Sequence, residues 1–314
     1  MGGRKTSPRH LVSFVLVILF MTHVSPASSE ERIPVGVILT GDAPYYREIH
    51  ESFLEGLKAE SYGPEKIEII LQKPVPNPMS WTNAVRKLVT FDAKVILSYG
   101  APATLTAMKE ASGIPIVFAA VYRPEDMGIS SKNATGIGLD VPVAGILKKL
   151  KAIVDYSKLG IVYSGSEADT VIQVRKAQAL SETMNFTAEM IDLAKRKGAL
   201  NLSGLDAIFL TTSCAGMRCV EDIIGLARKA GIPTAASLGG AAEKGVLLTI
   251  SADTREQGAV ASAMVARVLN GSSPSDIESK KATKIEFIVN LREAESLGLK
   301  VPFDLLAGAT RAIK

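Results

Sequence analysis

The chain contains one pattern twice: an apolar strand, a short polar loop, a helix, and then Gly-Ile-Pro before another strand. The first copy runs from Val95 to Phe118 and the second from Ala207 to Pro233. Each Gly can end its helix in a left-handed conformation, and each Pro prevents the helix from continuing. Strands that alternate with helices form parallel sheets, and ligands bind at the carboxyl ends of such strands. The repeat therefore predicts an α/β fold with two doubly wound parallel-sheet lobes, arranged as a clamshell.

Residues 1–27 have the pattern of a secretory signal peptide. Three basic residues precede an apolar run over 11–20, and Ser25-Pro26-Ala27 supplies the small-residue end. The apolar run is short for a bilayer span, so we predict cleavage after Ala27, with an uncleaved anchor as the alternative. No cysteine lies near this region, which argues against a lipid anchor. The sequence thus predicts a periplasmic or otherwise exported protein.

Cleavage removes three basic residues and no acidic ones, so the net charge falls from +4 to +1. The only dense basic cluster, Lys195-Arg196-Lys197, is short, and we interpret it as solvated surface. We therefore expect no nucleic-acid partner. The 287 remaining residues are enough for two domains with substantial cores.

The histidine and cysteine counts exclude several classes of chemistry. His10 and His23 lie in the predicted signal, which leaves His50 as the only histidine of the mature chain. A Ser-His-Asp or Cys-His enzyme and a His-rich metal site are therefore not expected, and neither is a cofactor. Cys214 and Cys219 lie five residues apart, and the sequence leaves open whether they form a local disulfide.

Apolar runs and their boundaries predict the order of elements. We expect Asp42 to cap the first helix, with Pro44 in its first turn. The expected strands are Ile33–Leu39, Ile67–Leu71, Val95–Ser98, Ile116–Ala119, a short strand near Thr135, Leu159–Tyr163, Thr187–Asp192, one from Ala207, Val246–Ile250 and Phe287–Asn290. The expected helices include Trp81–Val89, Leu105–Glu110, Ala144–Ile153, Val171–Met184, one from about Val220, Thr254–Leu269 and Arg292–Leu297.

Several segments, in this order and spacing, resemble the type I periplasmic binding proteins of ABC importers. The resemblance covers essentially the whole mature chain and favours the branch that includes receptors for tryptophan and other aromatic amino acids. The segments that carry it are Gly113–Val121, Asn133–Ile137, Asp206–Phe209, Ile288–Asn290, Leu297–Leu299 and Val301-Pro302.

The resemblance implies two lobes joined by three crossings, with the ligand in the cleft between them. The first lobe would comprise 31–139 and 252–282, and the second 140–251 and 283–314. A ligand that touches both lobes would favour their closed state. The implied protein is a monomeric, non-enzymatic receptor that delivers a small molecule to an ABC permease, and the ligand would be similar to an amino acid.

Four loops that follow strands and open helices supply the candidate binding residues: 40–46, 98–104, 164–170 and 212–219. Helix N termini attract a carboxylate, and Ser98, Ala101 and Thr104 are the residues we expect to hold one. An aromatic wall is expected from Tyr45, Tyr46, Tyr99 and Tyr122. Glu167 or Asp169 would neutralise a ligand amine, and Thr212 and Ser213 complete the candidates.

Each candidate also has a structural alternative. Loop tyrosines are often surface residues, and Glu167 and Asp169 fit equally well as helix-capping charges. Trp81 fits packing at a helix start better than a stacking platform. The segment 122–126 reads either as an exposed self-paired loop or as part of the cleft.

One stretch departs from the family pattern. Relatives that bind amino acids carry Thr-Asp-Asn after the strand at Asp206, where this chain has Thr212, Ser213 and Cys214. The ligand therefore either lacks an amine or finds its carboxylate partner elsewhere.

Two other functions are alternatives to a transport receptor. The same fold can serve as a sensor that presents its closed form to a membrane kinase or chemoreceptor, and the sequence does not separate the two. An exported hydrolase or transferase is disfavoured, because the chain lacks Gly-x-Ser-x-Gly and Gly-x-Gly-x-x-Gly motifs and is poor in histidine.

Overall fold

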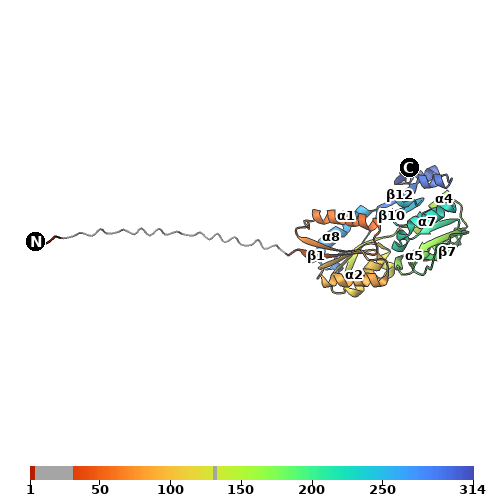
Figure 1. The fold of residues 1–314 in the computed structure, drawn as a ribbon. Coiled ribbons are helices and arrows are strands. Elements are labelled where there is room, and N and C mark those ends of the chain that lie inside the picture. Colours follow the sequence, from red (N-terminus) through yellow and green to blue (C-terminus); the bar gives the residue numbers. More distant parts are fainter. Residues whose placement is uncertain (4–30, 130–132) are drawn as a thin grey trace. The chain divides into compact units, whose positions relative to one another are not determined.

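The computed structural model describes residues 1–3, 31–129 and 133–314, and its helices and strands lie in one compact unit, Arg32–Lys314 (Figure 1). Apart from residues 1–3, the predicted signal segment lies outside the described residues. Within the described ranges, no helix combines the length and apolar character that a membrane span needs.

The first lobe is built on a six-stranded sheet whose strands are all parallel, in the order β11-β5-β4-β3-β1-β2. Its middle strands are almost wholly buried, as expected for a sheet covered on both faces. Figure 1 shows α1 and α8 on one face and α2 on the other, where α3 packs against α2. The elements are β1 (Ile33–Leu39), α1 (Pro44–Ala59), β2 (Ile67–Gln72), α2 (Pro78–Thr90), β3 (Val95–Tyr99), α3 (Ala101–Glu110), β4 (Ile116–Tyr122), β5 (Ala134–Leu139), α8 (Thr254–Leu269) and β11 (Lys280–Lys281).

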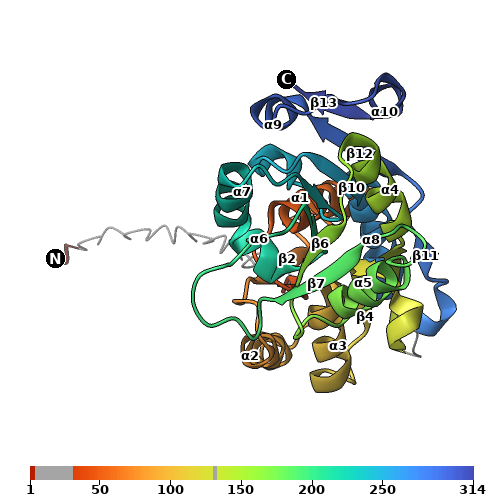
Figure 2. The ribbon, with the colours of Figure 1, turned by 90° about the vertical axis from the view of Figure 1, so that its right-hand side faces the viewer.

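The second lobe is built on a seven-stranded sheet in the order β13-β12-β10-β9-β8-β6-β7. Its strands are parallel except where β10 pairs with β12 in the antiparallel sense. Figure 2 shows β12 and β13 at one end of this sheet, next to α9 and α10. The elements are α4 (Val143–Ile153), β6 (Lys158–Tyr163), α5 (Ala168–Ala179), β7 (Thr187–Asp192), β8 (Ala207–Leu210), α6 (Cys214–Arg218), α7 (Val220–Lys229), β9 (Thr234–Ala236), β10 (Leu248–Ala252), β12 (Ile285–Asn290), α9 (Leu291–Ser296), α10 (Phe303–Ala307) and β13 (Arg311–Ile313).

Sheet membership shows where the described chain passes between the lobes. It leaves the first sheet after β5, returns after β10 to form α8 and β11, and crosses again before β12. The carboxyl ends of β1 and β3 thereby face those of β6, β8 and β9, because the segments after β1 contact those after β6, β8 and β9, and α3, which follows β3, contacts α5. The prediction of two α/β lobes with parallel sheets is confirmed, with the antiparallel β10–β12 pair as its one departure.

Two local predictions were wrong in detail. Gly231 ends its helix with φ +69°, as expected, whereas Gly113 is not among the residues of positive φ. Asp42 does not cap α1, which begins after Ala43 without a side-chain cap. Asp42 instead forms exposed ion pairs with Arg47 and Lys73, so its carboxylate points away from the helix end.

Candidate functional site

The two lobes touch where loops at the carboxyl ends of their strands meet, and we call this junction the cleft. A methyl group added to Gly41, after β1, would lie 3.1 Å from Cβ of Cys214, at the start of α6. One added to Gly239, after β9, would lie 2.5 Å from Cδ2 of Tyr45 on α1. Backbone and side chains of the two lobes are therefore in van der Waals contact across the cleft.

The four predicted tyrosines are all buried, at most 2% exposed, so the alternative that they are surface residues is wrong. The ring centroids of Tyr46 and Tyr99 lie 6.2 Å apart, and those of Tyr45 and Tyr46 lie 6.0 Å apart. The Tyr46 hydroxyl faces the Cys214 thiol of the other lobe. Burial, reinforced by Cys214 and the acidic side chains beyond it, raises the pKa of Tyr46 well above its usual value. Tyr46 is therefore a neutral hydroxyl at the centre of the lobe contact.

Tyr45 is held in place by a buried hydrogen-bond network that reaches the crossing segments. Its hydroxyl donates to the carbonyl of Ala252, at the end of β10, over 3.0 Å and accepts from Nε2 of Gln257 over 2.5 Å. Oε1 of Gln257 accepts from the backbone amide of Ala120 over 2.9 Å. Ala120 has φ +57° and lies where the β4–β5 register shifts. Sequence reasoning missed Gln257, although a glutamine among apolar helix positions is a signal of a buried polar contact.

The predicted carboxylate cradle in the first lobe is largely occupied by the protein itself. The Ser98 and Thr104 hydroxyls share a 2.9 Å hydrogen bond, and Thr104 also donates to the carbonyl of Gly100 over 2.8 Å. The amide of Ala103 donates to Oγ1 of Thr40 over 3.2 Å. Since residue 102 is a proline without an amide hydrogen, Ala101 is the first-turn donor of α3 left for a ligand.

Glu167 caps a neighbouring helix rather than its own. Its Oε2 accepts from the amide of Cys214 over 2.9 Å, and Oε1 accepts from the amide of Ala215 over 3.1 Å and from the Ser213 hydroxyl over 2.9 Å. Burial raises the pKa of Glu167 although these donors lower it. The charge of this carboxylate is therefore spread over the N terminus of α6.

Asp169 lies two residues further on and has an unused oxygen. Its Oδ2 accepts from the Thr212 hydroxyl over 3.0 Å, whereas Oδ1 is buried and has no hydrogen-bond partner among the described residues. Burial, and then the nearby charge of Glu167, raise the pKa of Asp169 to about 7. This oxygen therefore has free capacity to bind.

A chain of hydrogen bonds fixes the direction of the Thr212–Asp169 contact. Gln173 donates through Nε2 to the Thr212 hydroxyl over 2.6 Å, and its Oε1 accepts from the Thr212 amide and the Ser237 hydroxyl. The Thr212 hydroxyl has one hydrogen, and since it already accepts from Gln173 it donates that hydrogen to Asp169. Sequence reasoning missed Gln173 and Ser237, which act only through partners brought close by folding.

Both cysteines are free thiols in the structure, so the disulfide that the sequence left open is not formed there. The Cys219 thiol donates to the carbonyl of Ala215, one turn back, over 3.3 Å, while Cys214 points into the cleft. The short helix α6 precedes α7, and Ser213 caps it by accepting from the Gly216 amide over 3.1 Å.

The remaining predicted loops lie at the rim of the cleft. Arg123, after β4, pairs with Asp126 and Asp140, so the self-paired alternative holds for the charges while Tyr122 is buried. Trp81 packs at the start of α2 and donates from Nε1 to the carbonyl of Thr40 over 2.7 Å. Within the described ranges, no cluster of three or more His, Cys, Asp or Glu side chains could hold a metal ion.

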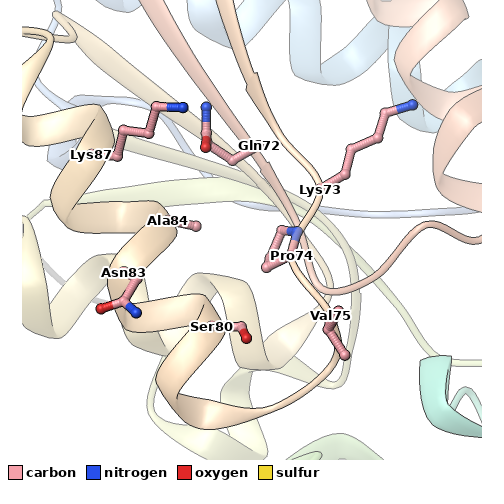
Figure 3. Close-up of a pocket in the computed structure, with 8 residues that line it drawn as sticks. All are labelled: Gln72, Lys73, Pro74, Val75, Ser80, Asn83, Ala84 and Lys87. Carbon is pink, nitrogen blue, oxygen red and sulfur yellow. The ribbon is translucent and has the colours of Figure 1, made fainter.

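A separate hollow of about 310 Å³ lies between the end of β2 and α2 (Figure 3). In that view the Gln72 and Lys87 side chains extend toward each other, while Lys73 points away from them. Since β2 is an edge strand and the hollow involves only the first lobe, it lacks the two-lobe contact of the cleft. It is lined by Gln72, Lys73, Pro74, Val75, Ser80, Asn83, Ala84 and Lys87.

Comparison with known proteins agrees with this architecture. A family model described as ABC transporter substrate binding protein matches residues 32–313. A solved ABC domain from Streptococcus pneumonia in complex with L-Trp has a TM-score of 0.82 at 20% identity, covering 90% of this chain and 100% of that one. A conserved domain protein from Vibrio cholerae has a TM-score of 0.82 at 22% identity, with the same coverage. The uncharacterized protein RP367 of Rickettsia prowazekii is 21% identical over 290 residues, 89% of each chain.

Proposed function

The chain belongs to the family of ABC transporter substrate-binding proteins, and from that premise we propose that it is exported, holds its solute in the cleft and delivers it to an ABC permease. Proteins of this class bind their substrates without chemical turnover, and the cleft residues fit that role. They are tyrosines, hydroxyls and carboxylates, with no paired nucleophile and general base among the described side chains. His50, the one mature histidine, is on α1 and shares a 3.2 Å hydrogen bond with the Tyr99 hydroxyl.

The observation that carries the choice of site is Oδ1 of Asp169. It is an unpartnered, buried acceptor at the place where both lobes meet. An unmet acceptor of this kind costs free energy unless something else binds it, so a ligand is its natural partner. We include Tyr45, Tyr46, Tyr99 and Tyr122 as the aromatic wall, with Ser98, Ala101, Thr104, Glu167, Thr212 and Ser213 lining or supporting the same site.

Closure of two lobes around the ligand is the second part of the proposal. We assign 31–139 and 252–282 to the first lobe, and 140–251 and 283–314 to the second. A ligand that contacts Tyr46 from one lobe and Asp169 from the other binds the closed form better than the open form, and so shifts the population toward closure. The closed form would be the one that a permease recognises.

Export through residues 1–27 and action as a monomer complete the proposal. Delivery to a permease is favoured over a sensory role, because the family match spans nearly the whole mature chain and is to transporter components. A neighbouring gene pair for a permease and an ATPase would support this assignment.

The direct test is identification of what the protein binds. Mass spectrometry of compounds released from the purified mature chain, followed by thermal-shift measurements, should find a small molecule that raises Tm by mass action. The same molecule should emerge unchanged after incubation. If no amine, amino acid, purine or sugar raises Tm, the proposal of solute capture fails, and conversion of a bound compound would contradict the non-enzymatic assignment.

A further inference from the structure

The cleft contains two carboxylates and no basic side chain paired with them. Glu167 and Asp169 have no ion-pair partner among the described residues. Arg123, next to Tyr122, is committed to Asp126 and Asp140 at 2.5 and 2.8 Å. Buried carboxylate oxygens normally have a cationic or hydrogen-bonding partner, so an oxygen with neither marks the place where a partner can bind.

The two carboxylates are not equivalent. The amides at the start of α6 and the Ser213 hydroxyl surround Glu167, which accounts for both of its oxygens. Asp169 accepts one hydrogen bond, from the neutral Thr212 hydroxyl to Oδ2, and Oδ1 has no hydrogen-bond partner among the described residues, although the nearby amides of Asp169 and Thr170 lower the pKa of the group. The missing positive partner therefore belongs to Asp169.

Apart from the Ala101 amide at the start of α3, donors for a negatively charged ligand group are scarce in the same place. The hydroxyls of Ser98 and Thr104 bond to each other, and the Tyr45 hydroxyl donates to a backbone carbonyl. The Tyr99 hydroxyl is engaged with His50. What the first lobe offers instead is aromatic rings, and rings attract cations through their π faces.

Resting on the proposed function, we propose that the solute is an organic cation, whose charged nitrogen sits on Oδ1 of Asp169 beside Tyr46 and Tyr122, and that a carboxylate on the solute is not required. The hydrogen bonds from Ser237 and Gln173 through Thr212 hold Asp169 in position for this contact. Tyr46 and Tyr122 both lie within electrostatic reach of Asp169. The carboxylate that is missing from the loop after β8 is thus supplied by the start of α5.

Three series of compounds test the proposal. Within each series the apolar part is the same and the charge differs. The probes are tryptamine, L-tryptophan and indole-3-propionate, then phenethylamine, L-phenylalanine and 3-phenylpropionate, then isopentylamine, L-leucine and 4-methylpentanoate. Thermal shift and calorimetry on the mature chain should show the amine as the tightest member of each series that binds. The zwitterion should bind at least about tenfold more weakly, since its carboxylate enters a site short of donors. Equal or tighter binding of zwitterions or carboxylates would overturn the proposal while leaving solute capture intact.

Asp169→Asn removes the charge and keeps the shape of the side chain. Amine affinity should fall by about 30-fold or more, because one member of a buried charge pair is lost. Asp155→Asn is the matched control: the Asp155 side chain is 92% exposed, pairs with Lys151 and lies outside the cleft, and the variant should bind as the parent does. Asp169→Ser is the second variant if Asp169→Asn fails to fold. Unchanged amine affinity in a folded Asp169 variant would overturn the inference, and absence of binding in all three series would count against the proposed function and this inference together.

Discussion

A close approach between the lobes, at Gly239 and the Tyr45 ring, makes closure of the cleft sensitive to one methyl group. A methyl at Gly239 would lie 2.5 Å from Cδ2 and 3.0 Å from Cε2 of Tyr45. Carbon atoms pack best at about 3.5–4.0 Å, so the ring would have to withdraw by about 1 Å. The Tyr45 hydroxyl is fixed by Ala252 and Gln257, and withdrawal would strain or break those hydrogen bonds.

The size of the effect follows from where the clash occurs. Overpacking of a close contact costs about 1–3 kcal/mol. Gly239 and Tyr45 lie on different lobes in the proposed assignment, so in the closure we propose this cost falls on the state in which the lobes touch and not on either lobe alone. The closed population, and with it the apparent ligand affinity, should fall by about 5- to 150-fold. Gly239 is not a residue of positive φ, so alanine brings no backbone strain of its own.

Calorimetry with the compound that co-purifies should therefore show weaker binding to Gly239→Ala, and small-angle X-ray scattering should show a larger radius of gyration at equal ligand concentration. Gly225→Ala on α7 is the control, because its added methyl would meet no described atom within 4 Å. In a Tyr45→Ala background the effect of Gly239→Ala should disappear, since the ring that it meets is gone. The reasoning fails if Gly239→Ala binds as the parent does, or if Gly225→Ala loses as much affinity.

Three further predictions concern stability without ligand. Because burial raises the pKa of Asp169 to about 7, the folded chain keeps this proton over a pH range in which the unfolded chain has lost it, and the free energy of unfolding falls as pH rises from about 4 to 7. Asp169→Asn should therefore gain Tm relative to the parent at pH 8 but not at pH 4. An equal difference at both pH values would contradict this. Gln257→Leu leaves the buried amide of Ala120 without its acceptor and should lower the free energy of unfolding by about 1–3 kcal/mol in urea titrations, whereas no change would mean that the amide finds another partner. Gly258→Ala would place a methyl 2.6 Å from the carbonyl oxygen of Ile49, where α8 crosses α1, and should lower the free energy of unfolding by about 3 kcal/mol or more in the same assay. Gly113→Ala is the control, because its added methyl would meet no described atom within 4 Å.

The architecture was predictable because it depends on patterns that recur along the chain. Alternation of apolar strands with helices was enough to predict two parallel sheets, and every strand of the first sheet except β11 was expected. The short strands β11 and β13 have two and three residues, too few for any periodicity to show. The antiparallel direction of β12 could not be predicted from the sequence either, because an apolar run predicts a strand and not its orientation.

Identical sequence also led to different local conformations. Both Gly-Ile-Pro units precede a strand, but only Gly231 adopts a left-handed conformation. The chain at Gly113 reaches Pro115 by a turn in which the amide of Ile114 donates to the carbonyl of Ala111. The tripeptide restricts the backbone conformation without determining it, because the direction of the preceding helix decides which turn forms.

The two acidic candidates of the loop after β6 illustrate what sequence cannot separate. Glu167 and Asp169 are two residues apart at the start of α5, so their side chains leave the helix in different directions. One reaches the N terminus of α6 and is used there, while the other meets Thr212 and keeps an oxygen free. The sequence is compatible with capping and with ligand binding for both residues, whereas the hydrogen bonds give the cap to Glu167 and leave an oxygen without a partner only on Asp169.

The loop after β8 departs from the loop of relatives that bind amino acids, and its own contacts show what that change does. Their aspartate corresponds to position 213, where the Ser213 hydroxyl now donates to Oε1 of Glu167 over 2.9 Å. An aspartate there would set a second carboxylate beside Glu167, and the two could not both remain ionised without an added proton or cation. Serine removes this repulsion and supplies a hydrogen to Glu167, whose carboxylate also accepts from the amides of Cys214 and Ala215. Ser213 and Glu167 are therefore coupled, because an acid at position 213 would compete with Glu167 for the amides at the start of α6.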